Sequence, residues 1–178
     1  MKYIILNLII LAFFLSSCNN KSEKQLINSG ELIKTSTAFF SDSFRADTFK
    51  VVLKGKEPKK MLLTFNIITA EGIEIYKKVF KARDLIHNYK ETVDLRKKNK
   101  QQSFITGEFD FFLDEENFLW PAITSDQKPD QHSPDKYFFK ELQDSQLNGF
   151  KYRISKETKV YIAWSAKERR VKVYYYCC

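Results

Sequence analysis

The sequence contains few of the residues, and none of the motifs, on which most enzyme and metal sites depend. Its 178 residues include two histidines and three cysteines. No glycine-rich phosphate loop, G-x-S-x-G, H-E-x-x-H or C-x-x-C motif occurs in the chain. The sequence therefore offers no basis for a motif-defined nucleotide, serine-hydrolase or zinc site, and we expect a non-enzymatic protein without a cofactor.

Glycine and proline are also scarce, whereas aromatic residues are abundant. Five glycines and four prolines stand against 16 phenylalanines and nine tyrosines. This composition argues against a disordered chain and favours a packed hydrophobic core. The length suits one domain plus a tether.

The first 17 residues have the pattern of a secretory signal peptide. Lys2 precedes an apolar run from Tyr3 to Leu15 that only Asn7 interrupts, and two serines follow. The run is shorter than the roughly 20 apolar residues of a membrane-spanning helix, and small residues end it. We therefore expect residues 1–17 to be removed and the rest of the chain to be exported.

The four residues Leu15-Ser16-Ser17-Cys18 resemble the lipobox of bacterial lipoproteins. The resemblance implies that Cys18 begins the mature protein and carries a diacylglycerol, with acyl chains such as palmitate, on its sulfur. Two acyl chains suffice for stable anchoring. The lipobox implies that the protein is located in the cell envelope. Because residue 19 is asparagine and not the aspartate of an inner-membrane retention signal, the outer membrane is expected where the cell has one. An ordinary secretory signal and an uncleaved signal anchor are the alternatives.

Charge is distributed unevenly along a chain whose formal net charge is +8. Residues 48–100 carry 14 basic and six acidic side chains, residues 101–150 carry three and ten, and residues 151–178 carry eight and two. We expect these oppositely charged segments to neutralise one another in the fold. The alternative is that the basic segments form a surface that binds anionic lipid, an anionic envelope polymer or an acidic protein. Nucleic acid is not an expected partner of an exported protein.

The chain divides into a tether and one domain. Residues 18–47 are predicted to form the lipidated N-terminus and a tether, because short polar side chains recur there. Apolar pairs such as Phe39 and Phe40 indicate that its second half folds back. From Thr48 the hydrophobic period changes, so residues 48–178 are predicted to form a single domain.

The hydrophobic periodicity predicts an α+β fold. Alternating or apolar runs predict strands at 49–54, 61–69, 73–80, 103–113, 150–154, 160–164 and 171–175. One helix should run from Asp84 to a basic end at Lys100, and another from Ser133 and Pro134 to Gly149. The order predicts one antiparallel sheet of about six to seven strands, three N-terminal, one central and three C-terminal, with two helices packed on it.

Two groups of side chains are candidates for chemistry. Glu108 and Asp110 would share a strand face at about the separation of a glycosidase acid pair, although any acidic strand does the same. The second group comprises Asp126, Asp130, His132 and Asp135. It could hold a divalent cation, but we favour a solvated loop whose aspartates form turns and start a helix. His87, inside the first predicted helix, reads as an ordinary surface histidine. We expect neither a catalytic nor a metal site.

The chain ends in Tyr174-Tyr175-Tyr176-Cys177-Cys178. An exported protein meets oxidising conditions in many bacteria. Cys177 and Cys178 are therefore candidates for a vicinal or an intermolecular disulfide, although a vicinal bond strains the peptide between them.

The leading functional hypothesis is an anchored envelope lipoprotein that binds another macromolecule. A small basic domain would suit an acidic partner, as in an inhibitor or immunity-type protein. The alternative is an envelope hydrolase that acts on glycans through its acidic residues.

Overall fold

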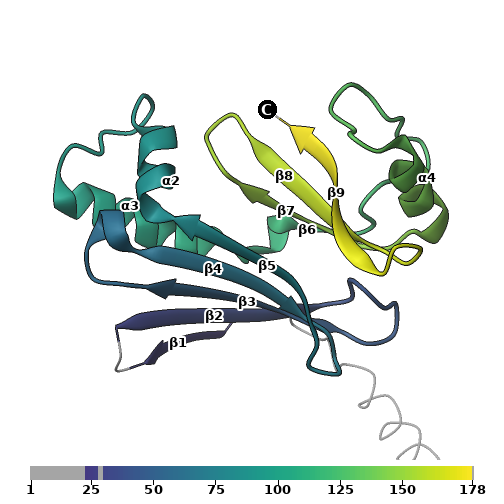
Figure 1. Ribbon diagram of the computed structural model, residues 1–178, viewed down its shortest axis with the longest axis horizontal. Coiled ribbons are helices and arrows are strands. Elements are labelled where there is room, and N and C mark those ends of the chain that lie inside the picture. Colours follow the sequence, from purple (N-terminus) through teal and green to yellow (C-terminus); the bar gives the residue numbers. More distant parts are fainter. Residues whose placement is uncertain (1–22, 28–29, 178) are drawn as a thin grey trace, which may run out of the picture.

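The computed structural model describes residues 23–27 and 30–177, which form two antiparallel sheets and three α-helices (Figure 1). The first sheet has the order β1-β2-β3-β4-β5, with bounds Glu23–Ile27, Glu31–Ala38, Asp47–Lys54, Leu62–Ile68 and Glu74–Lys81. The second has the order β6-β7-β8-β9, with bounds Phe118–Leu119, Gly149–Arg153, Lys159–Ser165 and Arg170–Cys177. The helices are α2 (Ala82–Tyr89), α3 (Lys98–Phe111) and α4 (Lys136–Ser145). The α+β class is therefore confirmed.

The prediction of one sheet is wrong, because the N-terminal and C-terminal strands pair in separate sheets. All seven pairs of neighbouring strands are antiparallel, and none joins β1–β5 to β6–β9. The helices α2 and α3 lie between the sheets in sequence, and Figure 1 shows them beside the second sheet. The two sheets are therefore joined by side-chain packing rather than by backbone hydrogen bonds.

The predicted tether is much too long, because β1 and β2 lie within it. β2 pairs with β3 over eight residues, from Glu31 opposite Lys54 to Ala38 opposite Asp47. Its serine and threonines resemble a loop in composition, yet Ile33, Thr35 and Thr37 alternate along the strand, and β-branched side chains suit a pleated surface. Only residues 19–22 separate Cys18 from the first strand.

The predicted strand at 103–113 is also wrong, since this segment lies mostly in α3. Its core residues are Gln101, Ile105 and Phe109, which recur every four residues along one helix face. The closely spaced phenylalanines had suggested a period of two. The basic residues 96–100 consequently lead into α3, and α2 ends earlier than predicted, at Tyr89.

The second predicted helix is confirmed as α4, but its ends differ from the prediction. Asp135 caps it, because one carboxylate oxygen accepts hydrogen bonds from the amides of Tyr137 and Phe138, both 3.0 Å long. Gln146 ends it in the left-handed conformation, at φ 52°. Gly149, the predicted terminator, begins β7. No helix in the described ranges is long and apolar enough to cross a membrane.

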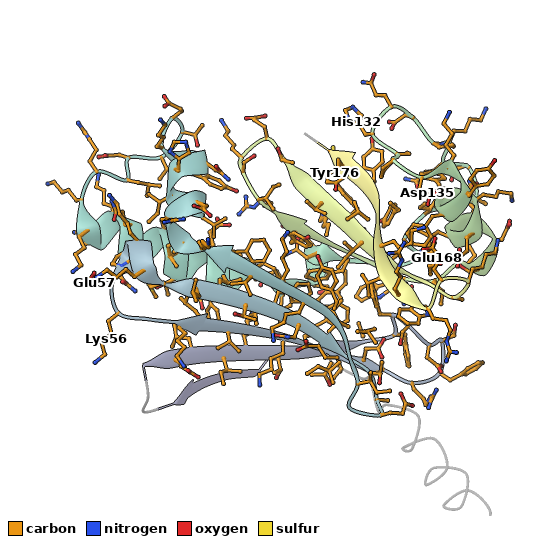
Figure 2. All side chains as sticks on the ribbon, in the orientation of Figure 1. Lys56, Glu57, His132, Asp135, Glu168 and Tyr176 are labelled. Carbon is orange, nitrogen blue, oxygen red and sulfur yellow. The ribbon has the colours of Figure 1, made fainter. Side chains whose placement is uncertain are left out.

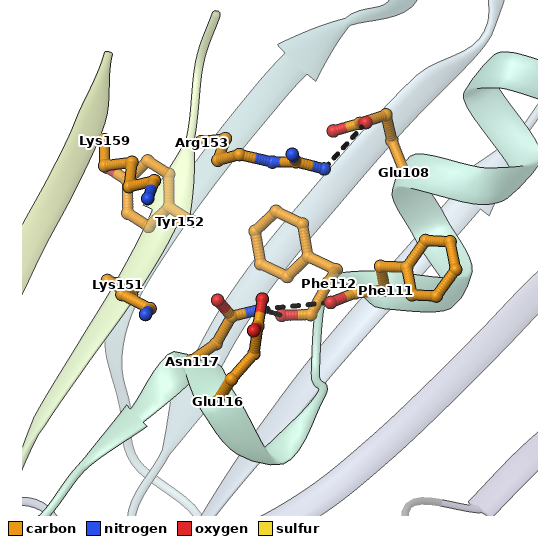
Figure 3. A pocket seen from close by; sticks show the side chains of 9 residues that line it. All are labelled: Glu108, Phe111, Phe112, Glu116, Asn117, Lys151, Tyr152, Arg153 and Lys159. Atoms are coloured by element: carbon orange, nitrogen blue, oxygen red, sulfur yellow. Dashed lines mark hydrogen bonds and ion pairs between the residues drawn. The ribbon is translucent and has the colours of Figure 1, made fainter. Parts of the chain in front are cut away.

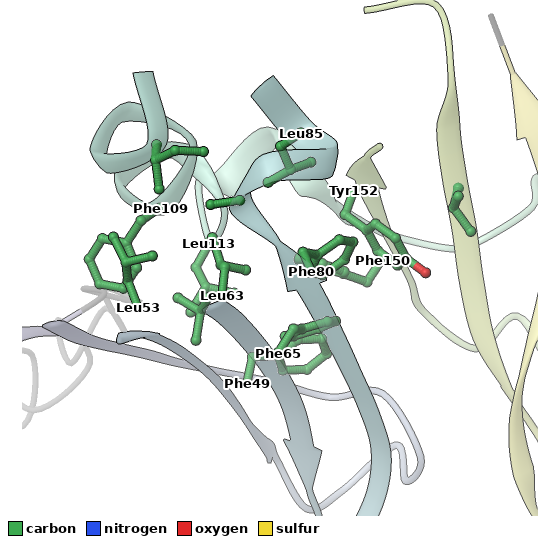
Figure 4. Packing of buried hydrophobic residues seen from close by; sticks show 14 of the residues in the cluster. Phe49, Leu53, Leu63, Phe65, Phe80, Leu85, Phe109, Leu113, Phe150 and Tyr152 are labelled. Carbon is green, nitrogen blue, oxygen red and sulfur yellow. The ribbon is translucent and has the colours of Figure 1, made fainter. Parts of the chain in front are cut away.

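Aromatic rings join the two sheets into one core (Figure 4). Phe49 on β3 lies 5.2 Å from Phe150 on β7 and 5.0 Å from Phe118 on β6, measured between ring centroids. Phe65 on β4 lies 5.1 Å from Phe150. A second, smaller hydrophobic cluster lies at α4 and includes Phe138. The domain therefore contains a large cluster between the sheets and a small one at α4.

Candidate functional site

A broad groove lies beside α2, at the end of the first sheet, and we call it the α2 groove. It encloses about 780 Å³, and its charged lining consists of Lys59, Arg83, Lys90, Glu91, Asp94 and Arg96, with His87 beside them. The 3-10 turn Pro58–Lys60 contacts both α2 and α3 and so brings Lys59 to this groove. Basic residues that are distant in sequence therefore converge at one end of the domain.

Ion pairs formed by the acids of the basic segment 48–100 leave part of its positive charge unpaired. Within the described chain, five of its six acids pair with cations of the same segment, as Glu57–Lys60, Glu74–Lys77, Asp84–Arg83, Glu91–Lys90 and Asp94 with Arg96 and Lys100, and Glu71 pairs with Arg45. The C-terminal segment does reach the acidic one, through Arg153–Glu108 and Lys172–Asp135. Positive charge therefore remains in excess around the α2 groove.

The acids near the α2 groove are fewer than the cations around it. Hydrogen bonds from Arg96 and Lys100 hold the pKa of Asp94 far below its usual range. Its carboxylate lies 2.9 Å from Arg96 Nε and 2.6 Å from Lys100 Nζ. Four further lysines at this end make no ion pair within the part of the chain that the structure describes, namely Lys56, Lys59, Lys97 and Lys98.

A second, smaller cavity of about 130 Å³ lies between α3 and β7, and we call it the α3–β7 pocket (Figure 3). Arg153 extends across it to Glu108, with 3.2 Å between Nη2 and Oε1. The Glu108 side chain is 15% exposed. Burial raises the pKa of Glu108, and the opposing charge of Arg153 limits that rise.

Charged and aromatic groups complete the α3–β7 pocket. Lys151, Lys159 and Glu116 line it, and within the described chain none of the three forms an ion pair. Phe112 stacks on Tyr152, with ring centroids 6.1 Å apart and planes 16° apart. The pocket is thus suited to a small polar ligand with one flat apolar side.

The predicted acid pair of Glu108 and Asp110 does not exist. Both residues lie on α3 rather than on a strand, and side chains two residues apart on a helix point in nearly opposite directions. The backbone carbonyl of Asp110 accepts a hydrogen bond from Lys34, away from the α3–β7 pocket. Glu116, in η3 (Glu115–Asn117), is the acid that shares the pocket with Glu108. Sequence reasoning missed it because the preceding segment 103–113 was predicted to be a strand rather than a helix.

The predicted cation-binding loop is likewise divided among separate contacts. Asp126 accepts a hydrogen bond from Thr124, and Asp130 accepts from the amide of His132 and the hydroxyl of Tyr175. Asp135, labelled with His132 in Figure 2, caps α4 and lies 2.7 Å from Lys172 Nζ. No group of three or more histidine, cysteine, aspartate or glutamate residues in the described ranges could hold a metal ion. The aspartates act as turn and cap residues.

The cysteine predictions remain untested, because Cys18 and Cys178 lie outside the described residues. Cys177 ends β9, where its thiol is hydrogen-bonded to the Tyr161 hydroxyl. The preceding tyrosines pack as strand residues: Tyr174 is buried and donates to the Ala122 carbonyl at 2.9 Å, whereas Tyr176 is exposed. The terminal disulfide therefore stays a hypothesis.

Tyr89→Phe is expected to raise the free energy of unfolding by about 1 kcal/mol. Among the described residues, the Tyr89 hydroxyl is the one buried side-chain polar atom without a hydrogen-bond partner. Burial raises its pKa to about 12. Urea denaturation measures the change.

Tyr152→Phe is the control, and its free energy of unfolding should fall by about 1 kcal/mol, because the Tyr152 hydroxyl lies 2.8 Å from that of Tyr76. A loss of stability in Tyr89→Phe would contradict the prediction.

Comparison with known proteins identifies no relative. No protein-family model, curated protein or solved structure matches the chain. Function must therefore be argued from the geometry of the α2 groove and the α3–β7 pocket.

Proposed function

We propose that this chain is a lipid-anchored protein of the bacterial cell envelope that acts as a non-enzymatic binding module. Its partner would be a protein with an acidic surface, which the α2 groove binds. The excess of cations around that groove carries the proposal. A diacylglycerol on Cys18 would hold the module at the membrane, in the outer membrane where the cell has one.

The charge arrangement supports an acidic partner in two ways. An excess of one sign of charge around a concave surface attracts a partner of opposite charge and speeds its encounter. The acids nearby are already paired with neighbours such as Arg83 and Lys90, so the lysines without ion pairs are available to a partner. An inhibitor or immunity-type protein would use such a surface against an acidic target.

The experiment is affinity capture from an envelope extract with the full-length lipidated protein and two matched variants. Arg83→Glu with Lys90→Glu changes the α2 groove and breaks two local ion pairs. Lys140→Glu with Lys156→Glu breaks two comparable pairs elsewhere. We expect one stoichiometric acidic protein to be captured by the wild type and the control, with at least tenfold less on the groove variant.

Capture that is equal for the two variants, or of a partner without an acidic surface, would overturn the proposed role of the α2 groove. Moderate salt should weaken genuine capture, because exposed charges are screened. Quantitative mass spectrometry of the eluates measures the amount of partner captured by the wild type, the groove variant and the control variant.

One observation favours glycan hydrolysis as a second candidate function. Glu108, whose pKa burial raises, shares the α3–β7 pocket with Glu116 and with aromatic side chains. Glycoside hydrolysis uses two carboxylic acids that flank the bond to be cleaved. If the protein cleaves envelope glycans, Glu108→Gln should abolish the release of reducing ends, whereas Asp110→Asn should retain it. Absence of cleavage by the wild type would eliminate this candidate.

A further inference from the structure

The five-stranded sheet has one face packed against the core and an opposite face, the outer face, which no described element covers. Phe49 and Phe65 point into the core. Figure 1 shows α2, α3 and the β6–β9 sheet on one side of β1–β5. The pairing register assigns the following residues of β2–β5 to the outer face: Glu31, Ile33, Thr35, Thr37, Thr48, Lys50, Val52, Lys54, Leu62, Thr64, Asn66, Ile68, Glu74, Lys77, Val79 and Lys81.

The outer face carries an aliphatic row between two rows that contain lysines. Ile33, Val52, Thr64 and Val79 are consecutive cross-strand neighbours. Beside this row on one side lie Lys50 and Lys77, and on the other lie Lys54, Leu62 and Lys81. Val79 is 47% exposed and Leu62 is 41% exposed. Aliphatic side chains bordered by lysines are typical of surfaces that lie on a membrane interface, where lysine stems reach towards the headgroups.

The outer face also keeps a positive excess. Lys54 pairs with Glu31 at 2.6 Å and Lys77 with Glu74 at 3.7 Å. Lys50 and Lys81 form no ion pair within the described chain. Two cations therefore remain for an anionic partner.

The expected lipid anchor at Cys18 lies close to the five-stranded sheet. Cys18 and Glu23, the first residue of β1, are five residues apart, which limits their separation to about 18 Å even when the chain is fully extended. β1 is the edge strand of the same sheet. Neighbouring strands lie about 4.8 Å apart, so β5 is within about 20 Å of β1. A lipid on Cys18 would thus keep the whole outer face close to the bilayer.

We propose that the outer face of the five-stranded sheet rests on the anionic headgroups of the membrane that carries the anchor. This inference rests on the lipid anchor of the proposed function. A symmetric pair of copies is a poorer occupant, because an isologous contact would set the lysine rows of one copy against those of the other. Since α2 and α3 pack on the core side of the sheet, this orientation points the α2 groove away from the bilayer, towards a partner.

The experiment measures lysine protection on vesicles. The full-length lipidated protein is added to preformed vesicles of phosphatidylcholine alone, or of phosphatidylcholine with phosphatidylglycerol, and labelled with a membrane-impermeant amine reagent. We expect labelling of Lys50 and Lys81 to fall about fivefold on the anionic vesicles only, the effect expected for one lysine beside an anionic surface. Lys140 and Lys156, which are exposed cations on α4 and on the β7–β8 connection, are the internal controls.

The possible outcomes test the lipid anchor and the orientation of the sheet separately. Failure to float with phosphatidylcholine vesicles would remove the anchor, whereas flotation with equal labelling of all four lysines would overturn the orientation alone. Protection of Lys50 and Lys81 already in detergent would show that protein rather than lipid covers the face, and would also overturn it. Lys77, on the same face, should also be protected on the anionic vesicles. Lys50→Gln with Lys81→Gln should restore its labelling, and Lys140→Gln with Lys156→Gln should leave it protected.

Discussion

Phe150→Ala is expected to lower the free energy of unfolding by about 4 kcal/mol, within the usual range for a buried phenylalanine. Phe150 is completely buried on β7, and its ring lies 5.0 to 5.2 Å from those of Phe49, Phe65 and Phe118. Two of these rings belong to the first sheet. Truncation therefore removes contacts that hold the two sheets together and leaves a cavity between them.

Urea denaturation followed by tryptophan fluorescence and by circular dichroism measures this loss. The tryptophans, Trp120 and Trp164, both belong to the part of the chain that forms the second sheet. Because the aromatic core is shared, both signals should shift to the same lower midpoint. Phe44→Ala is the control, since this ring is 91% exposed, and its effect should stay within about 0.5 kcal/mol. Two separate transitions in the wild type would contradict a single cooperative core.

Gly149→Ala is expected to lower the free energy of unfolding by about 2 kcal/mol through overpacking. A Cβ atom at this position would lie 2.9 Å from the Cβ of Ala122 and 3.1 Å from both its Cα and the Tyr174 hydroxyl oxygen. The obstructing groups are held in place, because Tyr174 donates to the Ala122 carbonyl and the Ala122 amide donates to Leu147. Neither can move away without losing a hydrogen bond.

Gly107→Ala is the matched control for this substitution. Gly107 lies within α3, and apart from its chain neighbours and the backbone of its own helix no described atom would come within 4 Å of its added Cβ. Alanine stabilises a helix by about 1 kcal/mol relative to glycine, so this variant should gain stability. Equal losses for the two variants in urea denaturation would show that the close approach at Gly149 is not the cause.

Local patterns in the sequence were enough to predict most strands and one helix correctly. Phe49, Val51 and Leu53 alternate with more polar residues on β3, and a half-buried strand requires that alternation. The three C-terminal strands followed from the same period and from short connections. The α4 helix was predicted from its polar start and its apolar stripe, even though Asp135 rather than Ser133 caps it.

The errors occurred where local composition suggested the wrong period. Phenylalanines at alternate positions suggested a strand at 103–113, but tertiary packing selected the helical face that contains Ile105 and Phe109. Serine and threonine in β2 suggested a loop, although pairing with β3 makes the strand. Both decisions depend on partners that are distant in sequence, and no window of local residues contains them.

The candidate sites show the same division. The excess of basic residues in segment 48–100 is visible in the sequence. Only the fold shows that Lys59 lies near Arg83, or that the local acids do not balance them. The opposite happened with Glu108 and Asp110, which are close in sequence and are separated by the geometry of a helix.

By itself, the sequence determined the α+β class, the antiparallel arrangement of most strands, the charge asymmetry and the expectation of a lipid anchor at Cys18. These properties depend on residue identity and on the order of residues that are close in sequence. The tertiary structure alone decided that the strands form two sheets, that Glu116 rather than Asp110 lines the same pocket as Glu108, and that β1 begins five residues after Cys18. The physical reason is that strand pairing and side-chain convergence are set by burial of the shared aromatic core, to which residues from the whole length of the domain contribute.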